Sequence, residues 1–183
     1  MSLRPKAVWF YSVFSFILIS FACTDSTKTK EKNNAESNVH SSLVFEQVPS
    51  EKSNLLFENN IKENIETKEN LFNYDYFYNG AGVGIADLNN DGLNDIFFCG
   101  NQVNNKLYVN KGNLVFEDNS EKAQINKNKS WSNGVTFVDI NNDGWLDIYI
   151  SQGGPFTRQQ RKNLLFLNQK NGAFKEIAEE VGL

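Results

Sequence analysis

Cysteine and histidine are scarce in this chain, and their scarcity excludes several kinds of protein. The 183 residues include two cysteines and one histidine. A disulfide scaffold is excluded, because Cys23 directly follows an apolar N-terminal run and leaves Cys99 as the only other thiol. His40 lies in a polar stretch, so no Ser-His-Asp or Cys-His catalytic group can be assembled in the folded part. We expect Cys99, which ends an apolar run, to be a small buried side chain.

Positive charge is also in short supply. The formal net charge is −4, and it becomes −6 (16 basic against 22 acidic side chains) when the two cations near the N-terminus are removed. This mild acidity argues against nucleic acid and against anionic lipid headgroups as partners.

The first 22 residues have the form of a secretory signal peptide. Two cationic residues precede an apolar run over 7–22, which is short for a membrane span. Ala22 before Cys23 resembles the bacterial lipobox, in which the cysteine is acylated and becomes the mature N-terminus, although Ser20 stands where Leu is usual. The sequence therefore predicts an outer-membrane lipoprotein of the bacterial cell envelope. A secreted protein with an ordinary cleaved signal and a retained membrane anchor remain alternatives.

Residues 24–42 are nearly all polar and have no apolar periodicity. Such a segment cannot bury enough surface to offset its ordering entropy. The sequence predicts a disordered tether that follows the lipidated Cys23.

Two nine-residue segments, 52 positions apart, repeat the acidic pattern D-x-N-x-D-G-x-x-D. Side-chain oxygens at positions 1, 3 and 5, with glycine at the sharp bend, are what a hard cation such as Ca²⁺ requires. Position 7 can add a backbone carbonyl and position 9 a carboxylate. The absence of His and Cys makes zinc or copper a poor fit. The candidate ligands are Asp87, Asn89, Asp91, Leu93 and Asp95 in the first loop, and Asp139, Asn141, Asp143, Trp145 and Asp147 in the second.

An EF-hand is excluded for both loops. It needs a bidentate Glu at position 12 and a helix on each side, but position 12 is Phe98 in one loop and Ile150 in the other. The flanking residues are β-branched and aromatic, which favours strands. A plain hairpin turn made of Asp, Asn and Gly is the alternative that the pattern leaves open.

The internal similarity extends beyond the loops, and each unit of about 50 residues predicts four short strands, as in a propeller blade. Residues 43–52 echo 114–122, which indicates a fragment of an earlier unit. Residues 55–78 are expected to form an irregular connection with one strand. The eight blade strands are expected at 82–86, 95–99, 106–110 and 114–118 in the first unit, and at 134–138, 147–151, 164–168 and 173–177 in the second.

The loops and their flanking strands resemble FG-GAP/VCBS repeats, the blade units of integrin-type β-propellers. The segments 76–80 and 179–183 resemble bacterial envelope lipoproteins of this group that bear an ASPIC/UnbV-type domain. The resemblance covers residues 43–183 and implies a role in recognition or adhesion. It also implies that the loop after the first strand of each blade binds Ca²⁺, through Asp87, Asn89, Asp91 and Asp95 and through Asp139, Asn141, Asp143 and Asp147.

The expected fold is all-β: a partial β-propeller of two four-stranded blades plus a fragment of a preceding one, with a disordered N-terminal tether. A closed propeller needs about four to eight blades, so we expect further blades in cis or in trans. The expected boundaries are 1–22 for the signal peptide, 23–42 for the lipidated cysteine and tether, 43–81 for the partial blade and connection, 82–125 for the first repeat and 126–183 for the second.

The expected function is a calcium-stabilised, non-catalytic recognition or adhesion module of the cell envelope, which is a fragment of a longer repeat protein and binds a protein or a glycan. The alternative is an accessory part of a polysaccharide-active enzyme with paired carboxylates. The regularly spaced carboxylates already belong to the loops, and Glu117 and Asp118 have the pattern of a solvated rim. Trp131, Trp145 and the aromatic segment 74–78 suit either packing between blades or stacking on sugars.

Overall fold

The computed structural model describes residues 45–126 and 131–183. The predicted signal peptide, the lipidated Cys23 and the tether therefore lie outside the described residues. In these two ranges, no helix is both long and apolar enough to span a membrane.

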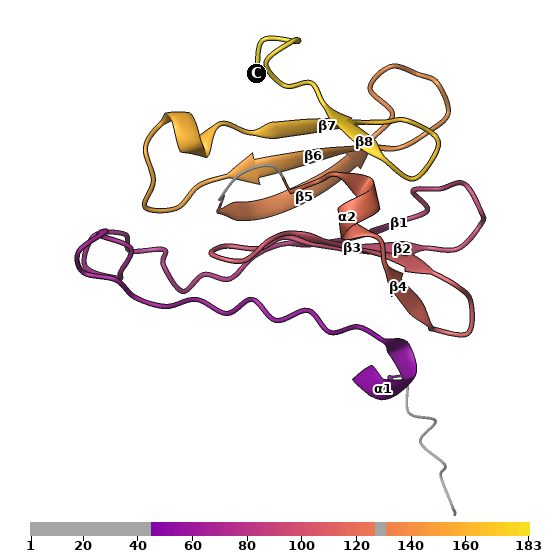
Figure 1. Cartoon of the computed structure of the whole chain (residues 1–183), viewed down its shortest axis with the longest axis horizontal. Helices are drawn as coiled ribbons and strands as arrows, with labels where there is room; N and C mark the ends of the chain where they lie inside the picture. Colours follow the sequence, from indigo (N-terminus) through magenta and orange to yellow (C-terminus); the bar gives the residue numbers. More distant parts are fainter. Residues whose placement is uncertain (1–44, 127–130) are drawn as a thin grey trace, which may run out of the picture. The chain divides into compact units, whose positions relative to one another are not determined.

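Two four-stranded antiparallel sheets, one from each repeat, make up the fold (Figure 1). In both sheets the spatial order of the strands follows the chain, β1-β2-β3-β4 and β5-β6-β7-β8, which is the arrangement of propeller blades. The predicted partial β-propeller is confirmed, and all eight strands lie within two residues of their expected bounds. The strands are β1 (Val83–Ala86), β2 (Asp95–Phe98), β3 (Lys106–Asn110), β4 (Phe116–Asp118), β5 (Ser132–Val138), β6 (Asp147–Gln152), β7 (Leu164–Asn168) and β8 (Phe174–Glu176).

The two sheets pack face to face because their strands alternate buried and exposed side chains. Phe97 and Leu107 of the first sheet share one buried cluster with Ile148, Ile150 and Phe166 of the second. In Figure 1 the second sheet, in orange and yellow, lies over the first. Both loops of the acidic pattern emerge from this common core, which fixes where they start and end.

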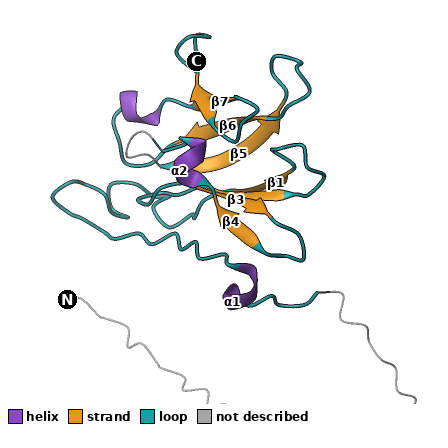
Figure 2. Cartoon of the chain, turned by 45° about the vertical axis from the view of Figure 1, so that its right-hand side comes forward, coloured by secondary structure: helices purple, strands orange, loops and turns teal. Residues whose placement is uncertain are grey.

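The described residues contain three short helical turns, one before β1, one between β4 and β5, and one between β6 and β7. They are the purple segments of Figure 2. The side chain of Asn54, just after the first turn, donates to the carbonyl of Phe116 at 3.0 Å. Asn119, just before the second, donates to the carbonyl of Gly172 at 3.2 Å. Both turns thus contact the last hairpin of the sheet that follows them, which supports the first turn as the end of a preceding unit. The turns are α1 (Ser50–Ser53), α2 (Ser120–Ala123) and η1 (Gln159–Arg161).

One expectation for the residues before β1 is wrong. Residues 55–78 contain no strand, only an isolated bridge between Asn64 and Glu69. The reason is that this segment crosses the outer face of the first sheet instead of pairing along an edge. The ring of Phe57 stacks on Phe98 at 4.8 Å, and the N–H of Leu56 donates to a side-chain hydroxyl of β3 at 3.4 Å.

The expectation for Cys99 is confirmed. Its side chain is buried in the core, and burial raises the pKa of the thiol to about 12. Because the thiolate is the reactive form, Cys99 acts as a packing residue rather than a nucleophile.

Candidate metal-binding loops

Each acidic loop connects the first two strands of its sheet. Ala86 pairs with Asp95 across the mouth of the first loop, and Val138 pairs with Asp147 across the second. The two hairpins therefore present positions 1 to 9 of the pattern at the same place in both repeats.

The backbone of both loops curls in the same way. Asn90 and Asn142, at position 4, have φ of 55°, while Gly92 and Gly144, at position 6, have φ of 85° and 82°. Asparagine tolerates the left-handed region better than most residues, and glycine enters it without strain. This explains why the repeated pattern carries Asn and Gly at these two positions.

The side chains at positions 1, 3 and 5 of the first loop converge. The N–H of Asp91 lies 3.1 Å from Oδ1 of Asp87 and 3.0 Å from Oδ1 of Asn89. The amide of Asn89 donates in turn to Oδ2 of Asp91 at 2.9 Å. One carboxylate and one amide oxygen thus gather around a single peptide N–H, and the Asn89 amide holds the second carboxylate beside them.

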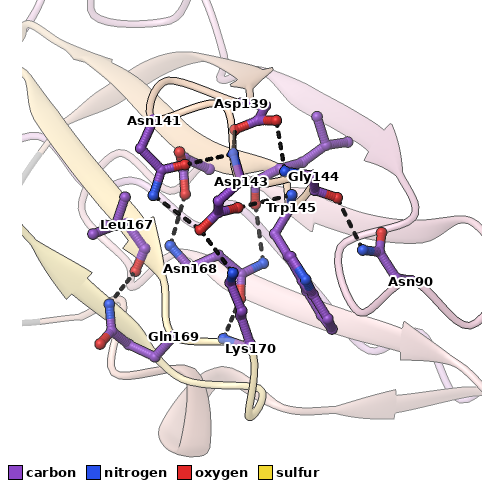
Figure 3. Close-up of polar contacts among 12 residues, drawn as sticks. Asn90, Asp139, Asn141, Asp143, Gly144, Trp145, Leu167, Asn168, Gln169 and Lys170 are labelled. Atoms are coloured by element: carbon purple, nitrogen blue, oxygen red, sulfur yellow. Dashed lines mark hydrogen bonds and ion pairs between the residues drawn. The ribbon is translucent and has the colours of Figure 1, made fainter.

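The second loop repeats this geometry, as the sticks in Figure 3 show. The N–H of Asp143 donates to Asp139 at 2.9 Å and to Asn141 at 3.2 Å, and Asn141 donates to Asp143 at 2.9 Å. One difference is that Nζ of Lys170 lies 3.1 Å from Oδ2 of Asp143. Burial alone would raise the pKa of Asp143, but hydrogen bonds from Asn141, Lys170 and the N–H of Trp145 together lower it. The second loop therefore carries its own counter-ion.

Position 7 contributes a backbone N–H to the same group of atoms. Leu93 donates to Oδ1 of Asp91 at 2.9 Å, and Trp145 donates to Oδ1 of Asp143 at 3.0 Å. These bonds hold the chain around the position 5 carboxylate.

The position 9 carboxylates have both oxygens engaged by backbone N–H groups. Asp147 is buried, and it accepts from the N–H of Ile140 at 3.1 Å and of Asn168 at 2.8 Å. Asp95 accepts from loop residue 88 at 3.0 Å and from Asn110 at 2.9 Å. Burial raises the pKa of Asp95, and these hydrogen bonds oppose that effect. Each carboxylate therefore ties its own loop to the third strand of its sheet.

Two asparagines that the sequence interpretation did not select connect the loops to each other. Asn90 donates to the carbonyl of Gly144 at 3.0 Å, across the boundary between the repeats. Asn168 donates to the carbonyls of Leu88 at 2.8 Å and Leu146 at 3.0 Å, one in each loop. The sequence does contain a signal for Asn168, because the repeat aligns it with Asn110 at the end of the third strand of each sheet.

The donor atoms fit a hard cation. Across residues 45–126 and 131–183, no three Asp, Glu, His or Cys side chains form a group suited to a metal ion. Each loop instead offers two carboxylates and one amide oxygen, the hard ligands that Ca²⁺ prefers and that soft metals do not. A carboxylate oxygen that accepts one N–H keeps a second lone pair for a cation. The present hydrogen bonds therefore leave the ligands usable.

The family of the chain follows from its match to a sequence model described as an FG-GAP-like repeat, which spans residues 51–150. The chain belongs to the FG-GAP-like repeat family. The match covers more than half of the chain and includes both FG-GAP loops. Repeats of this family build β-propeller-type modules, which often serve adhesion or recognition. A search of curated proteins found no significant match.

The aromatic residues divide into two groups in this FG-GAP structure. Trp131 is buried, with its ring 5.2 Å from Phe77 and 5.9 Å from Tyr74, so it packs against the connection that precedes the first repeat. Phe72 and Tyr76 are 92% and 62% exposed and are available to a ligand.

Proposed function

We propose that the chain is a non-catalytic recognition or adhesion module whose two FG-GAP loops bind Ca²⁺ and are stabilised by it. The observation that supports this is the same convergence of position 1, 3 and 5 oxygens in both loops. Bound Ca²⁺ supplies positive charge between carboxylates that otherwise repel each other. The residues that would hold it are Asp87, Asn89 and Asp91 in the first loop and Asp139, Asn141 and Asp143 in the second.

Calcium is expected to raise the melting temperature. Extracellular sites of this kind have dissociation constants on the order of 10⁻⁴–10⁻³ M, so millimolar calcium stabilises the folded chain by about 1 kcal/mol per site. Two sites together contribute about 2 kcal/mol, so for a unit of this size we expect the melting temperature, followed by circular dichroism, to rise by about 5–10 °C between EDTA and 5 mM CaCl₂. The double variant Asp91→Ala, Asp143→Ala should lose this rise.

The matched control is Asp75→Ala, which removes an exposed carboxylate outside both loops. It should keep the calcium-dependent rise in full. A melting temperature of the unaltered chain that is the same in EDTA and in calcium would refute the structural role.

Two carboxylates outside the loops, Glu117 and Asp118, are ion-paired and poorly suited to acid–base chemistry. Glu117 lies 2.8 Å from the ammonium group of Lys111, and Asp118 lies 2.6 Å from that of Lys106. The hydrogen bond from Lys111 lowers the pKa of Glu117, so this group stays ionised and is a poor proton donor. We therefore favour a binding module over the accessory part of a polysaccharide-active enzyme.

We propose that further blades, in cis or in trans, cover the exposed outer side of β1 in the first sheet. Val83 and Ile85 of β1 are 55% and 63% exposed. Their equivalents in the second repeat, Val135 and Phe137, are packed against the core between the sheets. Exposed apolar side chains at a position that is covered in the next repeat support a missing neighbour.

We also propose that Cys23 carries a lipid that anchors the protein in the bacterial outer membrane, with residues 24–42 as the tether. The apolar run before the cysteine and the small Ala22 support this. Mass spectrometry of the protein from membranes is expected to find a mature N-terminus at Cys23 with added acyl mass. The variant Cys23→Ser should not be acylated, and an N-terminus without acyl mass in the unaltered protein would contradict the proposal.

A further inference from the structure

The connection into the first repeat is much longer than the one into the second. Between α1 and β1 the chain runs through residues 54–82, whereas residues 124–131 suffice between α2 and β5. In repeat proteins, insertions collect on one face and often make the binding surface. The inserted segment is anchored by Phe77, which is fully buried against Trp131.

This insertion forms a hollow of about 460 Å³ with the first residues of the second repeat. The volume lies within the range of roughly 300–1,000 Å³ that is usual for small-molecule sites. The hollow lies where the chain enters β1, whereas the first FG-GAP loop begins where the chain leaves it, after Ala86. The lining residues are Tyr74, Tyr76, Asn79, Gly80, Ala81, Gly82 and Asn133.

The lining chemistry is neutral, aromatic and amide-rich. Among the described residues, the lining contains two phenol rings and two side-chain amides, but no Asp, Glu, Lys or Arg. Within the described residues, the amides of Asn79 and Asn133 and the hydroxyl of Tyr76 make no hydrogen bond. They are therefore available as donors and acceptors for a ligand. A charged ligand would find no counter-charge here, and a purely apolar one would leave these amides unpaired.

The two rings are held in a defined arrangement. Tyr74 packs edge-on against Tyr76 at 5.8 Å and against the buried Trp131 at 5.9 Å. The N–H of Asn79 donates to the carbonyl of Tyr76 at 3.2 Å, which closes the turn that brings both side chains to the hollow. Because the side chain of Tyr74 is already held in place, little of its conformational entropy is lost when a ligand binds, and this favours binding.

We infer that this hollow binds a neutral saccharide unit. A sugar ring has an apolar face of C–H groups that suits the exposed ring of Tyr76, and hydroxyls around its edge that suit the amides of Asn79 and Asn133. The inference names the ligand class for the proposed recognition function. It does not depend on calcium, because no loop residue lines the hollow.

The test begins with a glycan array that carries neutral gluco-, manno- and galacto-configured oligosaccharides. The protein is then titrated with the oligosaccharides that give a signal on the array. Tetragalacturonate serves as the charged counterpart, and saturation-transfer NMR reports the contacts. At least one neutral oligosaccharide is expected to bind with a dissociation constant on the order of 1 mM. Tyr76→Ala should weaken it by about three- to tenfold. Asn133→Asp, which keeps the shape but replaces donor hydrogens by charge, should weaken it similarly.

The matched control is Phe72→Ala, because Phe72 is an even more exposed aromatic of the same segment that does not line the hollow. It should leave affinity unchanged. The inference is overturned if no neutral oligosaccharide binds, if Phe72→Ala weakens binding as much as Tyr76→Ala, or if tetragalacturonate binds equally well. Binding that persists in EDTA while melting is indifferent to calcium would support the saccharide site and refute only the calcium proposal.

Discussion

Asp147→Ala is expected to lower the free energy of unfolding by about 3–5 kcal/mol, because it leaves one buried and one partly buried N–H group without an acceptor. In the unaltered chain, one carboxylate oxygen accepts from Ile140 and the other from Asn168, with Asp147 itself 1% exposed. Hydrogen bonds to a charged group contribute about 1.5–3 kcal/mol each. A loss of this size is a large part of the stability of a domain. The measurement is urea denaturation in EDTA, read as a shift of the midpoint.

Two further variants define the cause of this loss. Asp147→Asn keeps one acceptor oxygen and should fall between the wild type and Asp147→Ala. Glu180→Ala removes an exposed carboxylate paired with Lys175 and should change stability by less than about 1 kcal/mol. If Asp147 acted only as a metal ligand, the difference between Asp147→Ala and wild type would vanish in EDTA. That result would contradict the role of this carboxylate as a tie between loop and strand.

Gly82→Ala is expected to destabilise the chain by about 2–3 kcal/mol through overpacking where the repeats meet. A Cβ at Gly82 would lie 2.9 Å from Cα of Gly134 and 3.0 Å from the carbonyl oxygen of Asn133, and both are backbone atoms. Neither strand can retreat easily. The Gly82 carbonyl accepts from Cys99 at 2.9 Å, and Gly134 pairs with Ser151 in the second sheet.

The equivalent glycine of the second repeat supplies the control. A Cβ at Gly134 would meet only the hydroxyl of Ser151, at 3.2 Å, and this side chain can rotate away. Gly134→Ala should therefore be neutral or slightly stabilising, since it also reduces the freedom of the unfolded chain. Equal denaturation midpoints for the two variants would contradict the predicted overpacking of a Cβ at Gly82 against the backbone of the second repeat.

The strands could be predicted because two independent signals agreed. The alternation of apolar and polar residues marked each strand, and the repeat marked the same positions twice, for example β3 and β7. The helical turns α1 and α2 were not predicted, because a four-residue helix is too short to show an amphipathic period. The strand expected within residues 55–78 is absent because the aromatic residues of this segment pack on a sheet face or on Trp131. A local pattern of apolar residues does not distinguish such packing from strand pairing.

The candidate site could be predicted in its residue types but not in the role of each residue. The spacing of Asp95 and Asp147 suits a metal ligand and an acceptor of backbone N–H groups equally well, and only their burial separates the two roles. The aromatic residues present the same problem. Trp131 and Tyr76 are both large and amphipathic, yet one is buried and the other 62% exposed. That difference arises from the insertion before β1, which a local pattern cannot place.

The contacts of Asn90 and Asn168 have a consequence for how the two loops respond to an ion. Asn90 holds the carbonyl of Gly144, and Asn168 holds carbonyls of both loops. Ordering one loop thereby reduces the conformational entropy that its neighbour has to lose. If calcium is taken up as proposed, the two uptake events are thermodynamically linked, and each should strengthen the other by the same factor. Calcium binding to neighbouring blades would then be cooperative, so the fraction of occupied sites would rise more steeply with calcium concentration than it would for two isolated hairpins.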